Sequence, residues 1–331
     1  MNKRKFKKTI SIFVLVFLVL TATVTILSGC NQKISRTFFA ADTVCTITLY
    51  DGNNEILDNA VTLCNDLANK FDSYNENSEL SKLNKQGELE NPDKDLYELI
   101  KKGLYYSQLK NGKFDITIKP VSELWDFKNE VIPPNDAIQK ALNKVGYDRV
   151  VLNKKSIKLN NTIIELGAIA KGYIADKIIY FLQENGVNSA IVNLGGNISV
   201  LGKKKNQDFI VGIAKPFEQT TIASVKVSDM SVVTSGIYQR YIKKGDEIYH
   251  HLLNTKTGYP ENNEFSSVTI IAKNSVDADA LSTLCFLLGK EQATKLIEEK
   301  EGIEAVFIDN KNELFLTSGL KLDKEKVIIK K

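Results

Sequence analysis

The stretch Glu165-Leu-Gly-Ala-Ile-Ala-Lys-Gly-Tyr173 decides how the rest of this chain is interpreted. An apolar strand is predicted just before it, from Thr162 to Leu166. An amphipathic helix is predicted after it, because Ile174, Ile178 and Leu182 share one helical face. The small residues between strand and helix let a ligand approach the backbone, and the helix N-terminus offers free N–H groups and the positive end of the helix dipole.

Lys171 adds a full positive charge to this strand-to-helix junction. Free N–H groups and a lysine together suit an anionic phosphate. A tight turn with an exposed lysine would explain the stretch equally well, so other parts of the sequence have to separate the two interpretations.

Five basic residues open the chain and are followed by an apolar run from Ile10 to Leu27. This order is typical of a secretory signal, although the run also approaches the length of a membrane-spanning helix. Ser28-Gly29-Cys30 resembles a bacterial lipobox, which favours the signal. We expect residues 1–29 to be a lipoprotein signal peptide and Cys30 to carry lipid, so that acyl chains anchor the protein on the extracytoplasmic face of the cell membrane.

The basicity of the chain belongs to this signal. The whole chain has a formal charge of +4, and removal of the five basic residues before Cys30 leaves −1. A nucleic-acid partner is therefore not expected. With 43% hydrophobic and 25% charged residues, the composition is that of a globular protein. We expect a lipidated tether over residues 30–37 and one domain over residues 38–331.

Three cysteines remain besides Cys30, namely Cys45, Cys64 and Cys285. An odd, scattered set without a C-x-x-C pair or a neighbouring histidine argues against a disulfide framework or a zinc site. Buried free thiols are expected instead.

Hydrophobic periodicity predicts the remaining elements. A strand is expected from Arg36 to Tyr50. The other predicted elements are helices over residues 55–71, 93–109 and 135–146, a buried strand over 190–194, and mainly strands from 209 to 272. No internal repeat or low-complexity linker is present in the sequence. We therefore expect a single compact α+β domain, with helices early and a mainly antiparallel sheet late.

For the adjacent histidines and for Tyr74, the sequence leaves open which side chains contact a ligand. The only histidines, His250 and His251, are adjacent, and on an extended strand they point to opposite faces, so at most one can serve a given pocket. Tyr74 is an isolated tyrosine in the polar loop 72–84. It either presents its ring to a ligand or lies on the surface without a role.

Asp279 and Thr283 are four residues apart in a stretch with helical periodicity, so they lie on one face of the helix. A carboxylate and a hydroxyl one turn apart offer hard oxygens to Mg²⁺, which needs few protein ligands. Capping of the helix N-terminus by Asp277 or Asp279 is the alternative.

Eight blocks in the same order make the chain resemble the ApbE family, the FAD:protein FMN transferases. The resemblance covers about residues 38–320. The matching blocks are Ala41-Asp-Thr43, the loop from Ser73-Tyr74 to Asn84, Gly112-Lys-Phe-Asp115 with the later Leu124-Trp125, Glu165 to Tyr173, Asn193-Leu-Gly-Gly196, Thr234-Ser-Gly236, His251 to Pro260, and Ala278-Asp-Ala-Leu-Ser-Thr283.

The resemblance implies an enzyme that uses Mg²⁺ to split the pyrophosphate of FAD, attaches FMN by a phosphoester to a threonine of an exported acceptor protein, and releases AMP. Flavin-carrying subunits of membrane redox complexes of the Rnf or Nqr kind are the implied acceptors. The implied metal ligands are Asp279, Thr283 and the backbone carbonyl of Ala168. The implied FAD contacts are Ala41, Tyr74, Phe114, Asp115, Glu165, Lys171 and Leu253.

Three positions depart from the family pattern. Ala41 stands where methionine is common, Glu165 replaces a frequent aspartate, and Asn254-Thr255 replaces a frequent Asp-Pro. The first removes a flavin-packing contact, the second moves a charge by one methylene, and the third changes a turn.

His251 is the expected catalytic residue. A threonine hydroxyl is a poor nucleophile at neutral pH, and a base with a pKa near ~6.5 could accept its proton, a contribution of typically ~10²–10⁴-fold. Two alternatives remain. A FAD pyrophosphatase would use the same metal site and release FMN and AMP with water as the nucleophile. A lipoprotein that only stores or delivers flavin would lack a metal site, and Asp279 and Thr283 count against it.

Overall fold

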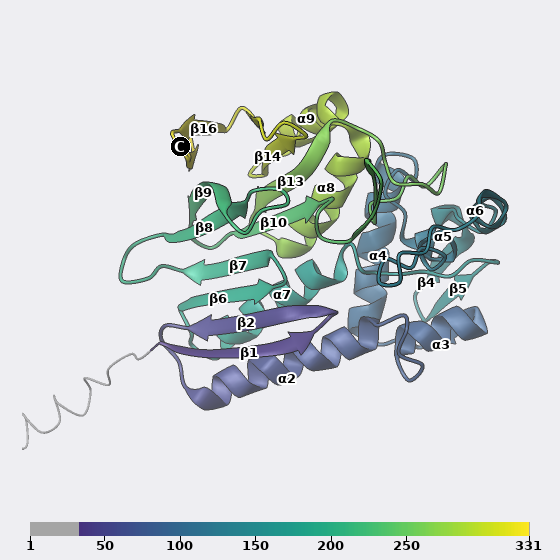
Figure 1. The fold of residues 1–331 in the computed structure, drawn as a ribbon. Helices are drawn as coiled ribbons and strands as arrows, with labels where there is room; N and C mark the ends of the chain where they lie inside the picture. Colours follow the sequence, from purple (N-terminus) through teal and green to yellow (C-terminus); the bar gives the residue numbers. More distant parts are fainter. Residues whose placement is uncertain (1–32, 331) are drawn as a thin grey trace, which may run out of the picture. The chain divides into compact units, whose positions relative to one another are not determined.

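The computed structural model describes residues 33–330 (Figure 1). The predicted signal peptide 1–29 and Cys30 lie outside the described residues. The first strand, β1 (Ile34–Ala40), begins inside the segment 30–37 that the sequence assigns to a tether. No helix in the described part has the length and apolar character needed to cross a membrane.

An eight-stranded sheet forms the centre of the fold, and every neighbouring pair in it is antiparallel. Its strands in spatial order are β1 (Ile34–Ala40), β2 (Thr43–Leu49), β6 (Ser189–Leu194), β7 (Asn197–Gly202), β10 (Ser231–Gly236), β13 (Phe265–Ala272), β14 (Glu304–Asp309) and β15 (Leu314–Leu316). All eight residues of β13 are buried, because both faces of the sheet are covered there.

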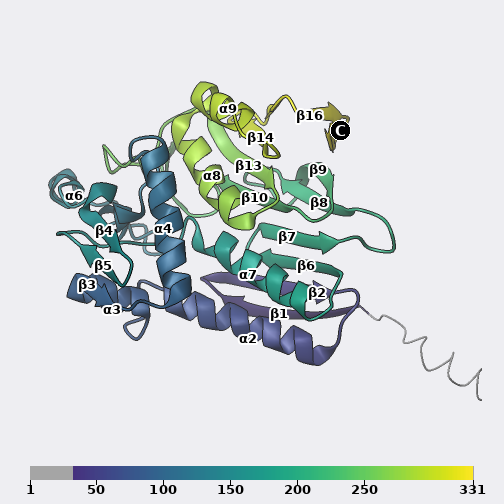
Figure 2. The same ribbon diagram turned by 180° about the vertical axis from the view of Figure 1, so that it is seen from behind.

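Helices cover one face of this sheet, which is the face turned to the reader in Figure 2. They are α2 (Asn54–Phe71), α4 (Lys94–Leu109), α7 (Ala170–Glu184), α8 (Ser275–Leu288) and α9 (Lys290–Glu298). Of these, α8 is buried almost all round, because it packs against α7 and α4 as well as against the sheet. A helix that is apolar on most sides needs such a central position.

A smaller four-stranded sheet packs on the opposite face. Its order is β16 (Leu320–Asp323), β17 (Lys326–Ile329), β9 (Thr221–Val227) and β8 (Phe209–Ala214), and the β17–β9 pair is parallel. Phe209, Val211 and Ile213 alternate inward from β8 and form a second apolar core with Val232 and Ile271 of the large sheet. The class is therefore α+β with a mainly antiparallel sheet, as predicted.

A third group of short elements lies beyond the ends of the central strands. It contains α3 (Glu79–Gln86), β3 (Glu88–Glu90), η1 (Ile116–Ile118), α5 (Lys119–Ser122), α6 (Asn135–Leu142), η2 (Tyr147–Arg149), β4 (Val150–Asn153), β5 (Ser156–Leu159), and the hairpin of β11 (Tyr241–Lys244) and β12 (Glu247–His250). Trp125 anchors this region, since its Nε1 donates to the Gly258 carbonyl at 3.1 Å. The three cysteines Cys45, Cys64 and Cys285 are buried free thiols.

The predicted strand over residues 36–50 is wrong in one respect, because it is a hairpin. Ala41 and Asp42 have φ values of +49° and +56°, which a two-residue hairpin turn requires. The usual Asn-Gly signal for such a turn is missing from the sequence. The expected order of helices first and sheet second holds for most of the chain. The exceptions are β1 and β2, which precede the first helix, and α8 and α9, which come late.

The strand predicted from Thr162 to Leu166 is not formed. Its backbone groups have other partners: Ile164 exchanges two 2.8 Å hydrogen bonds with the Asn84 side chain, and the Glu165 N–H donates to the Ile116 carbonyl at 2.9 Å. The segment is therefore buried without pairing in a sheet. The helix predicted over 135–146 ends at Leu142, while α2 and α4 begin within one residue of their predicted starts and end where predicted.

Candidate active site

The Glu165–Tyr173 stretch forms the N-terminal end of α7 and lies against the start of α8 (Figure 2). A Cβ atom at Gly172 would be 2.4 Å from the Ser275 carbonyl oxygen, so only glycine permits this approach of two helix backbones. The first N–H groups of α8, on Ser275 and Val276, donate to Asp176 of α7 at 2.7 and 2.9 Å. The first turns of the two helices are therefore fixed relative to each other.

Asp279 binds α7 at the same place. The Gly172 N–H donates to Asp279 Oδ2 at 2.8 Å. In a regular helix this N–H would bond the carbonyl four residues earlier, which is that of Ala168. Within residues 33–330 no other donor bonds the Ala168 carbonyl. The Ala168 carbonyl, in the turn just before α7, is therefore left without a backbone donor.

Thr283 lies one turn further along α8, and its Oγ1 is 3.0 Å from Oγ of Ser235 on β10. Asp279 and Thr283 are both buried, and neither caps α8, whose first N–H groups are bonded to Asp176. Asp277, the other candidate cap, instead forms an ion pair of 2.6 Å with a lysine of α4. The structure therefore does not support the capping alternative for this pair.

The donors that the family resemblance assigns to Mg²⁺ fit such an ion. Burial raises the pKa of Asp279, and the charge of Lys171 lowers it. A cation stabilises a buried carboxylate in its ionised form. With Asp279, the Thr283 hydroxyl and the Ala168 carbonyl supply hard oxygens. The set contains one acidic residue, and residues 33–330 hold no cluster of three or more His, Cys, Asp or Glu side chains that could bind a metal.

His251 follows β12 and keeps one ring nitrogen available. Its Nδ1 is 3.1 Å from the Arg240 carbonyl oxygen, which only accepts, so Nδ1 carries the proton and Nε2 keeps its lone pair. Burial and the nearby charges of Arg240 and Lys171 lower the pKa of His251 to about 3. The ring is therefore neutral at pH 7 and can accept a proton, but the expected pKa near ~6.5 does not hold for the free protein.

His250 has no ring nitrogen to spare. It is buried, its Nε2 donates to the Glu261 carbonyl at 3.1 Å, and its Nδ1 accepts from the Leu252 N–H at 3.3 Å. Its ring also packs edge-on against Phe286, with 5.5 Å between ring centroids. His250 is therefore a structural residue, and only His251 is left for chemistry.

A second group of predicted residues surrounds Tyr74. The Tyr74 side chain is 65% exposed, and Lys119 Nζ lies 3.6 Å from its ring centroid. Glu165 accepts a hydrogen bond from Ser122 Oγ at 2.8 Å. Burial raises the pKa of Glu165, whereas this hydrogen bond and the charges of Lys119 and Arg240 lower it. Lys119 covers one face of the ring, so a flat ligand can stack only on the other face, beside a carboxylate that can accept hydrogen bonds.

Lys171 and Arg240 connect the two groups. Lys171 donates to the Gly167 carbonyl at 3.2 Å, and its charge acts on both Asp279 and His251. The charge of Arg240 acts on His251 and on the Tyr74 group. His251 therefore lies within electrostatic reach of the same charges as the Asp279 group and the Tyr74 group.

The four other predicted FAD contacts are three buried residues and one residue of a turn. Phe114, Asp115 and Leu253 are buried. The Asp115 carboxylate accepts from the N–H and hydroxyl of Thr117 and from an N–H of η2, so it holds two short helices in place. Ala41 occupies the β1–β2 turn. The side chains of Phe114, Asp115 and Leu253 thus have little surface left for a ligand.

Several polar residues of the site were not predicted. They are Lys119, Ser122, Asn197, Ser235 and Arg240. Arg240 lies 3.9 Å from Asp42 in the β1–β2 turn, a contact between distant segments that no local pattern indicates. Lys119 is buried, and a lysine between Ile118 and Pro120 was the one available signal.

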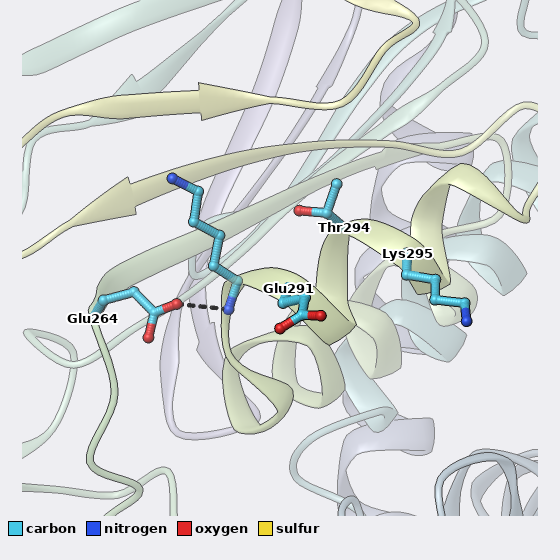
Figure 3. Close-up of a pocket in the computed structure, with 5 residues that line it drawn as sticks. Glu264, Glu291, Thr294 and Lys295 are labelled. Carbon is cyan, nitrogen blue, oxygen red and sulfur yellow. Dashed lines mark hydrogen bonds between the residues drawn. The ribbon is translucent and has the colours of Figure 1, made fainter.

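A separate hollow lies beside α9 and contains none of these residues. It is lined by Glu264, Lys290, Glu291, Thr294 and Lys295 (Figure 3). The Lys290 N–H donates to Glu264 at 2.7 Å there, which caps the start of α9. This hollow is a feature of the helix terminus and is not the candidate active site.

Comparison with known proteins places the fold. The solved structure of the ApbE protein of Thermotoga maritima superposes with a TM-score of 0.80 at 28% identity, over 87% of this chain and 97% of that one. The FAD:protein FMN transferase of Treponema pallidum is 31% identical over 90% of each chain. That of Klebsiella pneumoniae is 34% identical over 69% of this chain and 73% of its own.

Fold and site thus define a transferase enzyme of the flavin-transferase class. The sequence model of the ApbE family matches residues 41–307. The chain belongs to the ApbE family.

Proposed function

We propose that the protein transfers FMN from FAD to a threonine hydroxyl of an exported acceptor protein in a Mg²⁺-dependent reaction that releases AMP. The observation that carries this proposal is the buried Asp279 carboxylate, which the Gly172 N–H holds against the first turn of α7, within reach of the charge of Lys171. The same charge acts on His251, whose Nε2 is free. One substrate would meet a cation site, a positive charge and a proton acceptor.

The pyrophosphate of FAD carries negative charge that opposes attack by an oxygen nucleophile. Mg²⁺ held by Asp279, Thr283 and the Ala168 carbonyl would neutralise part of that charge and polarise the phosphorus–oxygen bond. Lys171 binds and orients the phosphate oxygens with a second positive charge. At the other end of the site, the exposed Tyr74 ring stacks on a flat part of the substrate, and Glu165 accepts hydrogen bonds from it.

His251 removes the proton of the attacking hydroxyl. The hydrogen bond from Nδ1–H to the Arg240 carbonyl holds the ring and leaves Nε2 as the acceptor. Anionic phosphates beside the imidazole stabilise its protonated form, so substrate binding raises the pKa of His251 from its low value in the free protein. The base becomes stronger when the substrate is in place.

The reaction balances without a covalent enzyme intermediate. The threonine oxygen bonds to the phosphorus on the FMN side of the pyrophosphate, and the bond from that phosphorus to the bridging oxygen breaks. The hydroxyl proton passes to His251 Nε2, and AMP leaves with the bridging oxygen. No group is oxidised or reduced.

The test is the intact mass of a threonine-containing acceptor after incubation with the protein, FAD and Mg²⁺. We expect a gain of one FMN mass, and no gain when valine replaces the acceptor threonine. Asp279→Asn should lose activity and regain part of it at higher Mg²⁺, because a neutral amide binds a hard dication weakly. Unchanged Mg²⁺ dependence in Asp279→Asn would contradict the metal assignment.

Two other outcomes would replace the proposal. Release of free FMN and AMP with an unmodified acceptor would identify a FAD pyrophosphatase. Binding of FAD without any turnover would leave a lipoprotein that carries flavin.

We also propose that the protein acts as an exported lipoprotein anchored through Cys30. The lipobox-like Ser28-Gly29-Cys30 after an apolar run supports this location. Flavin-carrying subunits of membrane redox complexes of the Rnf or Nqr kind would be reachable acceptors on that face of the membrane.

A further inference from the structure

Asn197 carries a buried hydrogen-bond donor without a partner. It is the first residue of β7 and is 2% exposed. Its Nδ2 and the Ser267 Oγ are the two buried side-chain polar atoms between residues 33 and 330 that make no hydrogen bond. An unpaired buried donor is destabilising, so its retention calls for a reason.

The hydrogen-bonding groups around Asn197 determine which way its Oδ1 and Nδ2 point. Asn197 Oδ1 accepts from Ser275 Oγ at 2.7 Å. Ser275 and Asp279 are four residues apart, so they lie on the same face of α8, and the amide bonded to Ser275 has Asp279 beside it. A carboxylate only accepts hydrogen bonds, so Nδ2 and not Oδ1 has to face it.

The Asp279 carboxylate already has one fixed donor. The Gly172 N–H holds its Oδ2 from the side of α7. Asn197 lies on β7 of the sheet, and its side chain lowers the pKa of Asp279, as a donor to the ionised carboxylate does. Two donors from two different elements would fix the orientation of the carboxylate, which a single N–H leaves free to rotate.

We propose that Asn197 is a positioning residue, whose Nδ2 donates to the Asp279 carboxylate and holds it in the orientation that binds Mg²⁺. This inference rests on the proposed function. Outer donors of this kind orient a metal ligand, and their removal typically weakens metal affinity by roughly 10–100-fold. Donation to Asp279 gives the buried Nδ2 a partner, and this explains why the amide is retained.

The test measures the affinity of the FAD-loaded protein for Mg²⁺ by calorimetry, with no acceptor present. Asn197→Leu, which keeps the side-chain size and removes the amide, should bind Mg²⁺ roughly 10–100-fold more weakly than wild type. Turnover at saturating Mg²⁺ should largely return. Ser267→Ala is the matched control, because it removes the other unpaired buried atom and alternation along β13 puts that side chain on the sheet face opposite to Ser235. It should keep wild-type affinity.

Wild-type Mg²⁺ affinity in Asn197→Leu would overturn the inference and leave the proposed function intact. A wild-type protein that binds no Mg²⁺ with FAD would overturn both. If Asn197→Leu does not fold, Ser275→Ala replaces it, since this variant keeps the amide and removes the hydroxyl that orients it. Several-fold weaker Mg²⁺ binding is expected there, and unchanged binding would overturn the inference.

Discussion

His250 and His251 are consecutive in sequence, yet their hydrogen bonds give them different tasks. Both nitrogens of His250 are bonded inside the fold, whereas His251 uses only Nδ1. Each assignment depends on a carbonyl eleven residues away, on Glu261 or on Arg240. The alternation of a strand could predict that the two rings differ, but the choice between them required the tertiary structure.

His251→Ala separates binding from chemistry. The imidazole contributes after FAD and metal are bound, so the variant should bind FAD nearly as well as wild type. Acceptor flavinylation should fall by roughly 10²–10⁴-fold. Flavin fluorescence measures the first quantity and acceptor mass the second. A weaker FAD affinity that accounts for the whole loss would leave His251 as a residue that shapes the pocket.

His250 gives a prediction for stability against pH. Burial lowers its pKa to about 4, so the unfolded chain takes up a proton as pH falls below ~6.5 and the folded protein does not. The stability that His250 contributes is thus present above ~6.5 and is lost toward pH 4.

The variant His250→Gln should not lose this stability as the pH falls, because glutamine does not titrate. The variant should be less stable than wild type at pH 8, because it cannot form both buried hydrogen bonds. The unfolding free energy of wild type should exceed that of His250→Gln by about 3 kcal/mol less at pH 4 than at pH 8. Denaturant unfolding at several pH values measures it. Parallel pH curves for the two proteins would show that His250 is not held neutral by the fold.

At the scale of elements, the α7–α8 junction brings the site together. The helices themselves were predictable, because their apolar spacing and the four-residue separation of Asp279 and Thr283 are local properties. The contact between the two helices could not be predicted, since Gly172 and Ser275 are far apart in sequence. The segment before α7 escaped prediction for a similar reason, because the Asn84 side chain replaces a strand partner there.

Gly172→Ala tests this junction. The added Cβ would be 2.4 Å from the Ser275 carbonyl oxygen, and two helix backbones cannot both shift to make room. We expect a loss of roughly 1–3 kcal/mol in unfolding free energy together with weaker Mg²⁺ binding. Gly167→Ala is the control in the same stretch, because a Cβ there meets no atom within 4 Å. Equal thermal stabilities of the two variants would contradict the tight contact.

At the scale of the whole molecule, composition and periodicity predicted the α+β class but not the order of the strands. Neighbours such as β2 and β6 pair across most of the N-terminal half of the chain. Such pairings depend on long-range packing that no local pattern encodes. Asn197 and Arg240 belong to the site through such long-range contacts. Asn197 became visible only when β7 and α8 were placed together, and Arg240 through its contacts with His251 and the β1–β2 turn.

Cys30→Ala tests the proposed location. Loss of the acceptor for lipid should release the protein from the membrane or leave its signal uncleaved, while the folded part remains active. Fractionation of cells followed by detection of the protein measures this. Normal processing and full membrane retention of the variant would contradict the lipobox.

The most direct test of the central claim is to run the transfer reaction in ¹⁸O-labelled water and to analyse acceptor, FMN and AMP by mass. Direct transfer from FAD to the acceptor hydroxyl predicts an acceptor heavier by one unlabelled FMN, with AMP that carries no ¹⁸O. Hydrolysis would place solvent oxygen on phosphorus. Labelled free FMN or labelled AMP beside an acceptor of unchanged mass would contradict the account.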